Sequence, residues 1–257
     1  MLKKSYTQVG FLKLLENIVR CHPLIYLLSR NISKYLRIFE ADAAGLKKID
    51  FQEKINCIDV GASDGIFINY INKFLSINKA ICFEPNKNYI LELKKINKIN
   101  LVINEYGLGL TERIEKIYVP YYKFFNWKFY LDAYSFPSYK NCDKQINLDF
   151  FFKKSISIEE REIVISNKVN LEEKINLIKI DINGNELEII KTLEEIIKRD
   201  KPIIYIENNF DTEEIIKILS IYEYKPYVYD LNKNNFLPFT NQQVLNIYFK
   251  NNQFKFI

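Results

Sequence analysis

Acidic and glycine residues are closely spaced in the segment CIDVGASDGIF, residues 57–67. The residues that could contact a ligand there are Asp59, Gly61, Ala62, Ser63, Asp64 and Gly65. A glycine-rich turn between a strand and a helix places backbone N–H groups beside a ligand. The pattern is D-x-G-x-x-x-G, and it lacks the middle glycine that lets a backbone approach a pyrophosphate in dinucleotide-binding folds. An acidic residue before the turn suits a ligand with a cationic or hydroxyl-rich part.

Polar residues also follow the next two apolar runs. Glu84 ends the run AICFE about twenty residues after the glycine turn, where a carboxylate can accept hydrogen bonds from both hydroxyls of a ribose. Pro85 and Asn86 follow it directly. Asn104 and Glu105 end the run LVINE. For Glu84, a capped turn before Pro85 is the structural alternative.

Three further carboxylates are candidates for proton transfer: Asp181, Glu186 and Glu207. Asp181 could instead cap the turn before the next helix, and Glu186 could stabilise the N-terminus of that helix. A minority hypothesis places Mg²⁺ at Asp181, Glu207 and Asn208, because hard oxygen ligands on adjacent strand ends suit that ion. The lone histidine, His22, precedes Pro23, and we expect it to be structural.

Apolar runs that alternate with helical patterns must position these residues. We predict strands at 55–60, 80–84, 101–105, 176–181 and 202–207. Helices are expected at 64–75, 86–97, 185–198 and 212–222. Two tail strands, at 227–231 and 245–250, are expected to form an antiparallel pair at the edge of the sheet. Runs of this kind favour a parallel sheet covered on both faces. Ligands bind such sheets outside the carboxyl ends of the strands, where the polar residues fall.

Residues 1–50 are predicted to form an N-terminal helical cap, with Pro23 separating two helices. Residues 51–257 form the main domain, which carries an insertion at about 110–165. Part of that insertion, residues 118–139, is rich in aromatic residues, and Tyr121, Tyr122, Trp127, Tyr130 and Tyr134 could contact an acceptor or form the insertion's own core. An interfacial membrane helix remains an alternative for the cap, because basic residues lie near its apolar ones.

The composition is that of a globular protein, with 48% hydrophobic and 27% charged residues in 257. The formal charge of +5 is modest, and the sequence shows no basic stripe. Both observations argue against a nucleic-acid partner. The four cysteines show no zinc spacing, and two of them, Cys57 and Cys82, are expected to be buried in strands. With no signal peptide and no apolar run long enough to span a bilayer, we expect a reduced, cytoplasmic protein.

The order of these motifs resembles the FkbM family of S-adenosylmethionine-dependent methyltransferases. The resemblance covers roughly residues 55–210 and rests on IDVGASDGIF, FEPN, NLIKIDINGNELEIIKTL and KPIIYIEN. The upstream segment RIFEADAAGLKKI has the family's character as well. Three positions depart from the family pattern: Ser63 stands where Asn is usual, Asn183 replaces Glu, and Gly107 replaces Ala. The change at 183 removes a carboxylate, so no base is assigned there.

The resemblance implies a class I methyltransferase (Rossmann-like) fold with a mostly parallel seven-stranded sheet, helices on both faces and the N-terminal cap. It implies S-adenosylmethionine as the cofactor, held by the glycine turn, by Glu84, Pro85 and Asn86, and by Asn104 or Glu105. It also implies O-methyl transfer, with a sugar hydroxyl of a bacterial surface polysaccharide or glycolipid precursor as the acceptor. Mg²⁺ is not expected, whereas weak membrane contact and homo-oligomerisation are left open.

The main alternatives are a non-catalytic relative and a nucleotide- or NAD-binding protein of glycan biosynthesis. The missing G-x-G-x-x-G and the absence of a Tyr-x-x-x-Lys pair count against NAD. The change at Asn183 keeps the non-catalytic alternative open.

Overall fold

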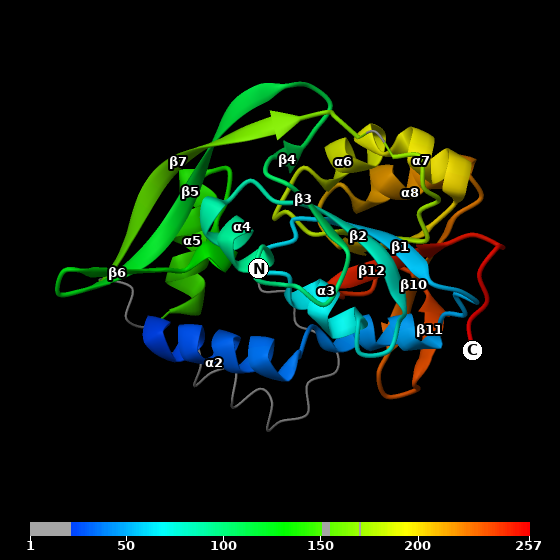
Figure 1. Cartoon of the computed structure of the whole chain (residues 1–257), viewed down its shortest axis with the longest axis horizontal. Coiled ribbons are helices and arrows are strands. Elements are labelled where there is room, and N and C mark those ends of the chain that lie inside the picture. The colour runs from blue at the N-terminus through cyan, green and yellow to red at the C-terminus, as the bar shows by residue number, and fades with distance from the viewer. Residues whose placement is uncertain (1–21, 151–154, 170) are drawn as a thin grey trace. The chain divides into compact units, whose positions relative to one another are not determined.

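The computed structural model describes residues 22–150, 155–169 and 171–257 (Figure 1). These residues separate into two compact units. The first unit, which we call the sheet unit, contains residues 39–113 and 165–257. The second, the insertion unit, joins residues 22–38 with residues 114–150 and 155–164 among those described. The helix within the predicted cap thus belongs with the insertion, whereas residues 39–50 belong with the sheet. The part of the cap before residue 22 lies outside the described residues.

The main sheet has eight strands in the order β11-β10-β12-β9-β8-β1-β2-β3. Their bounds are β1 Ile55–Val60, β2 Ile77–Phe83, β3 Leu101–Asn104, β8 Leu177–Ile180, β9 Ile203–Glu207, β10 Lys225–Asp230, β11 Asn235–Pro238 and β12 Asn246–Lys250. The five strands from β3 to β9 are parallel, and the other three pair antiparallel.

The prediction of seven strands was therefore wrong, because the sheet is mixed and has eight. The missed strand is β11, only four residues long, which follows a turn at Asn232–Asn234 and forms the edge of the sheet. The two tail strands do pair antiparallel as predicted, but β12 lies between β9 and β10 and so is internal. A four-residue segment that contains a proline carries too little alternation to be recognised as a strand.

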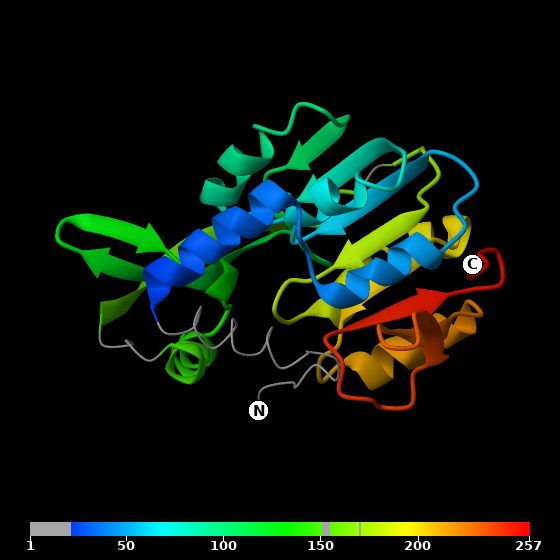
Figure 2. The ribbon, with the colours of Figure 1, turned by 90° about the horizontal axis from the view of Figure 1, so that it is seen from below.

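Each face of the main sheet has its own helices and its own apolar core (Figures 1 and 2). One face packs against α6 Glu186–Thr192, α7 Glu194–Asp200 and α8 Thr212–Ile221. The other packs against α3 Ile66–Ile71, α4 Lys87–Leu93 and the 3-10 helix η1 Ala41–Lys48. Strand residues alternate between the two cores, so neighbours in one row of the sheet share a face.

The remaining elements form the second sheet and its surroundings. This sheet has the order β4-β7-β5-β6, with β4 Gly107–Leu108, β5 Arg113–Phe124, β6 Trp127–Tyr130 and β7 Ile156–Ser166. The helices are α2 Pro23–Leu36 and α5 Tyr139–Asp149, with the 3-10 turn η2 Asp132–Tyr134. The described cysteines, Cys57, Cys82 and Cys142, are free and buried, which confirms the predicted burial of the first two. Cys21 lies outside the described residues.

Candidate functional site at the carboxyl ends of the strands

The predicted glycine turn joins β1 to α3 at the carboxyl end of β1. Gly61, Ser63 and Gly65 have φ angles of +72°, +53° and +77°. A side chain is strained in this region, and a Cβ on Gly61 would lie 2.1 Å from the backbone oxygen of Asp181. The turn is thus packed tightly against the loop after β8. Ala62 and Asp64 are buried within it.

Glu84 fastens this turn to the end of β2. Its Oε2 accepts a hydrogen bond from the Ser63 N–H at 2.7 Å, and its Oε1 accepts one from the Asn86 N–H at 2.8 Å. Burial raises the pKa of the Glu84 carboxyl to about 7, although the two N–H groups act in the opposite direction. Asn86 in turn caps α4, because its Oδ1 accepts from the Asn88 N–H at 3.0 Å. Each Glu84 oxygen keeps a second lone pair for a ligand.

A row of polar side chains crosses the sheet below these loops. Asp59, Lys179, Tyr205 and Tyr248 occupy matching register positions on β1, β8, β9 and β12. Lys179 Nζ lies 3.2 Å from Asp59 Oδ1 and 3.6 Å from Asp181 Oδ2, and it donates to the Gly61 carbonyl oxygen at 2.7 Å. Burial alone would lower the pKa of Lys179, but the charges of Asp59 and Asp181 outweigh burial and hold it above its usual value.

Asp59 is therefore neutralised inside the sheet. Its side chain is 0% exposed and its charge partner is Lys179. Because Lys179 also donates to the Gly61 carbonyl oxygen, this ion pair helps to hold the glycine turn in place. Asp181 differs, because its side chain is 34% exposed at the edge of the sheet. Of the two, Asp181 is the carboxylate that a ligand can reach.

Two acidic residues at the start of η1 extend this polar row, and sequence reasoning did not name them as site residues. The Tyr205 hydroxyl lies 3.1 Å from Glu40 Oε2 and 2.9 Å from Asp42 Oδ1. Asn246 Nδ2 donates to the same Glu40 oxygen at 2.6 Å. Burial and the charges of Asp181 and Asp42 raise the pKa of Glu40 to about 8. The available signal was the segment FEADA, because acids within an apolar stretch that packs on a sheet need partners.

Glu186 is the first residue of α6, and its side chain is buried against the loop after β8. Its Oε1 accepts from the Gly184 N–H at 2.9 Å, and its Oε2 accepts from the Asn209 side chain. It thus joins the loops after β8 and β9. Within this loop Asn183 and Asn185 have φ angles of +60° and +67°. Asn tolerates this region better than Glu does, which gives a backbone reason for asparagine at position 183.

The magnesium hypothesis stays a hypothesis, and its residues lie at the ends of β8 and β9: Asp181, Glu207 and Asn208. Among residues 22–150, 155–169 and 171–257, no group of three or more His, Cys, Asp or Glu side chains could hold a metal ion. The Asn208 amide donates to the Val244 carbonyl oxygen at 3.1 Å, and its Oδ1 accepts from Thr212 at 2.9 Å. Glu207 is partly buried at the end of β9.

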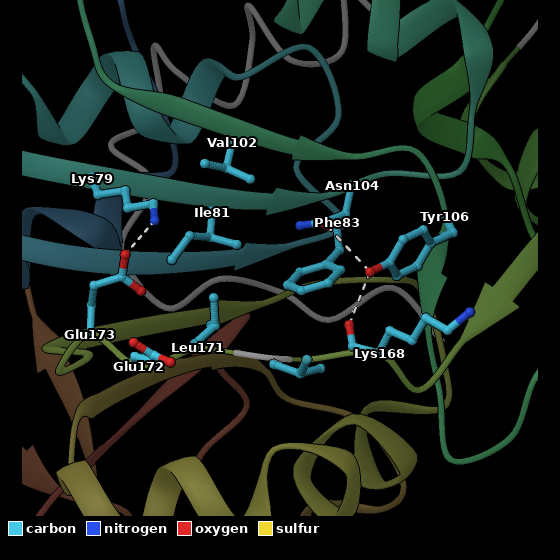
Figure 3. Close-up of a pocket in the computed structure, with 11 residues that line it drawn as sticks. Lys79, Ile81, Phe83, Val102, Asn104, Tyr106, Lys168, Leu171, Glu172 and Glu173 are labelled. Atoms are coloured by element: carbon cyan, nitrogen blue, oxygen red, sulfur yellow. Dashed lines mark hydrogen bonds and ion pairs between the residues drawn. The ribbon is translucent and has the colours of Figure 1, made fainter.

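A cavity of about 900 Å³ begins near the end of β3 and follows the outer part of the sheet (Figure 3). Asn104 and Tyr106 lie at one end, where the Tyr106 hydroxyl donates to the Lys168 carbonyl oxygen at 2.9 Å. The ion pair between Lys79 and Glu173 lies at the other end. Asn104 Nδ2 donates to the Cys82 carbonyl oxygen at 3.2 Å. Glu105 lies elsewhere, exposed and paired with Lys94, which directly follows α4.

The structure therefore brings most of the predicted site residues together at the carboxyl ends of the parallel strands. The turn, Glu84 and Asp181 are joined through backbone and charge contacts. Asp59 and Glu186 are enclosed behind these strand ends, whereas Glu105 is on the surface.

No curated protein matches the chain. Among solved structures, an FkbM methyltransferase from Methylobacillus flagellatus KT shares 14% identity at a TM-score of 0.47, over 76% of this chain and 43% of that one. A precorrin-6y C5,15-methyltransferase from Geobacter metallireducens GS-15 shares 16% identity at a TM-score of 0.39, over 81% of this chain and 84% of that one. The plantazolicin methyltransferase BpumL in complex with SAH shares 14% identity at a TM-score of 0.36, over 79% of this chain and 63% of that one. This chain thus spans less than half of the Methylobacillus chain.

The match to a sequence family is more extensive. Residues 59–229 match the methyltransferase FkbM domain, and this range begins at Asp59 and includes the glycine turn, Glu84 and Asp181. The matched residues make up more than half of the chain, and the chain belongs to the FkbM methyltransferase family.

Proposed function

We propose that the chain is an S-adenosylmethionine-dependent O-methyltransferase. The observation that carries the proposal is the glycine turn of residues 61–65, held to the end of β2 by Glu84. Glu84 binds the ribose hydroxyls, and the adenine lies toward the end of β3, where Asn104 and Tyr106 line the cavity. Pro85 and Asn86 shape the same end of the site.

The charges at the edge of the sheet support a cationic cofactor. Lys179 neutralises Asp59, which leaves Asp181 as the exposed carboxylate, with the buried acidic groups Glu40 and Asp42 on the same side. When bound, S-adenosylmethionine supplies a methyl group activated by a sulfonium, and its methionine tail carries an ammonium. Carboxylates near these two positive charges strengthen binding. The residues present thus fit this cofactor.

Methyl transfer to a hydroxyl asks two things of the protein. The acceptor oxygen must be held in line with the S–CH₃ bond, which is a matter of orientation. The hydroxyl proton must also be accepted, and a positioned carboxylate serves as the base. We assign that role to Asp181, with Glu207 at the neighbouring strand end as the second candidate. Glu186, which joins the two loops, is a positioning residue in this scheme.

The acceptor we propose is a sugar hydroxyl of a bacterial surface polysaccharide or glycolipid precursor. This assignment rests on the family resemblance and on the polar, carboxylate-rich edge of the sheet. Its test is a panel of free and lipid-linked sugars with labelled cofactor, in which mass spectrometry locates the transferred methyl group. Label on nitrogen or carbon would overturn the O-methyl assignment.

The first experiment titrates the purified protein with S-adenosylhomocysteine by calorimetry. We expect micromolar binding, at least tenfold weaker in Glu84→Ala, and unchanged in the control Glu214→Ala, which alters a 56% exposed carboxylate on α8. Parallel titrations with NAD and with a nucleotide sugar should show no heat. A folded protein that binds NAD but not S-adenosylhomocysteine would overturn the proposal.

A further inference from the structure

The insertion unit presents an exposed aromatic hairpin tip. Strands β5 and β6 pair antiparallel, and Phe124 faces Trp127 as the last pair before the turn. The exposed fractions of Phe124, Phe125 and Trp127 are 47%, 80% and 73%. Large side chains at this exposure lose hydrophobic stabilisation unless something covers them.

The backbone of this turn indicates that Phe125 is not there for stability. Only Phe125 and Asn126 separate the paired residues Phe124 and Trp127, and Phe125 has a φ of +50°. Two-residue hairpin turns favour Asn and Gly at such positions, because other side chains are strained at positive φ. A bulky, exposed aromatic residue in this conformation costs stability, and such costs are typical of functional positions.

A second exposed apolar surface lies in the same unit, on α2. Its members are Ile25, Leu28, Ile32, Tyr35 and Leu36, each at least 40% exposed. Their spacing places them in one stripe of the helix. The opposite side of α2 packs inward through Tyr26 and Leu27. The start of the helix lies beside the hairpin, because the ring centroids of His22 and Tyr122 are 5.0 Å apart.

The charges on α2 and on the hairpin tip, residues 121–130, are of one sign. Residues 23–37 and 121–130 contain five basic side chains and no acidic one: Arg30, Lys34, Arg37, Lys123 and Lys128. Lys128 donates to Glu159 at 2.8 Å, whereas Lys123 at the tip is exposed. Aromatic and aliphatic side chains flanked by lysine and arginine are typical of segments that lie in the headgroup region of a membrane. Within the described residues, no helix could cross a bilayer.

We propose that the hairpin tip and the outer face of α2 dock the protein onto an anionic lipid surface. Phe124, Phe125 and Trp127 enter the interface between headgroups and acyl chains, and the basic side chains contact lipid phosphates. Docking here does not depend on the proposed methyl transfer. A lipid surface is nevertheless where a lipid-linked sugar would be presented to the enzyme.

Trp127 is the only tryptophan in the chain, so its fluorescence reports directly on the tip. The probe is vesicles of phosphatidylcholine with phosphatidylglycerol, compared with vesicles of phosphatidylcholine alone. We expect the anionic vesicles to shift the Trp127 emission to shorter wavelength and to sediment the protein. Raising the salt concentration should weaken both effects.

Variants separate docking from folding. Phe125→Gly relieves the positive φ, so it should leave the thermal midpoint unchanged or raise it while weakening the vesicle partition about tenfold. Lys123→Glu should weaken binding to the anionic vesicles and leave binding to vesicles of phosphatidylcholine unchanged. The control is Phe210→Ser, which removes an aromatic side chain that is 85% exposed on the sheet unit. It should bind vesicles as the original protein does.

Two results would overturn the proposal. The first is an emission spectrum and a sedimentation profile that anionic vesicles leave unchanged. The second is self-association without lipid that Phe125→Gly abolishes, because the same surface would then bind a second copy of the chain.

Discussion

Lys179 and Asp59 are register neighbours on β8 and β1, and Lys179 Nζ lies 3.2 Å from Asp59 Oδ1. Both side chains are enclosed, with 4% and 0% exposed. The same ammonium donates to the Gly61 carbonyl oxygen at 2.7 Å and lies 3.6 Å from Asp181 Oδ2. One buried cation thus connects the first residue of the family match, the glycine turn and the reachable carboxylate.

Replacing Lys179 with Met should destabilise the protein by about 3–5 kcal/mol, because it leaves Asp59 enclosed without its charge partner. Asp59→Asn should cost less, because Lys179 keeps Asp181 and the carbonyl oxygen of the turn. The double variant Asp59→Asn with Lys179→Met should be more stable than Lys179→Met alone. Urea unfolding of the four proteins measures this coupling. Additive losses would show that the two charges do not stabilise each other.

Glycine is required at position 61 by contact as well as by conformation. Gly61 has a φ of +72°, and a Cβ there would meet the Asp181 backbone oxygen at 2.1 Å. We expect Gly61→Ala to cost more than about 1 kcal/mol of unfolding free energy and to abolish S-adenosylhomocysteine binding. Gly184→Ala is the matched control, because its φ is also positive, +127°, but nothing lies within 4 Å of the added atom. Equal losses of stability in both variants would argue against the contact.

The parallel core of the fold could be predicted from the sequence because its strands are continuous apolar runs. The run INCIDV is β1 over the same residues that were predicted, and the run at 202–207 begins only one residue early. Helix ends were less accurate. The helix predicted at 185–198 is divided at Leu193 into α6 and α7, because tertiary packing rather than periodicity decides where a helix breaks.

The sequence indicated which residues lie at the strand ends, but it did not indicate the contacts between segments that are far apart in the chain. The glycine turn and Glu84 lie at the ends of the neighbouring strands β1 and β2, as expected, but the hydrogen bond from the Ser63 N–H to Glu84 was not predicted. Glu40 meets Tyr205 across 165 positions of sequence, which no local pattern encodes. Lys179 did carry a signal, because a lysine inside an apolar parallel strand must find a charge partner.

Binding of S-adenosylhomocysteine should be linked to the proton of Glu84. Burial raises the pKa of its carboxyl to about 7, so a large part of it is protonated at neutral pH. Ribose hydroxyls donate to the ionised form, and binding therefore releases a proton and strengthens as the pH rises toward 7. Calorimetry in buffers of different ionisation enthalpy measures the release. Glu84→Gln should release none; identical release by the variant would assign the proton to another group.

Stability should fall as the pH rises because of Glu40. The Tyr205 hydroxyl lies 3.1 Å from Glu40 Oε2 and 2.9 Å from Asp42 Oδ1, and its single hydrogen can be donated to only one of them. One of the two carboxyls therefore favours keeping a proton, in agreement with the raised pKa of Glu40, about 8 against an ordinary 4.5. The other charged groups near Glu40 are Asp181 and Lys179.

The sign follows from proton counting. Between pH 4.5 and about 8 the folded protein binds more protons at Glu40 than the unfolded chain does, so the free energy of unfolding decreases with pH across that window. Glu40→Gln should flatten this part of the curve, whereas the exposed control Glu53→Gln should not change it. Urea unfolding at a series of pH values measures the slope. A slope that persists unchanged in Glu40→Gln would mean that the proton is held elsewhere, with Asp42 and Glu84 as the next groups to replace, because burial raises the pKa of both.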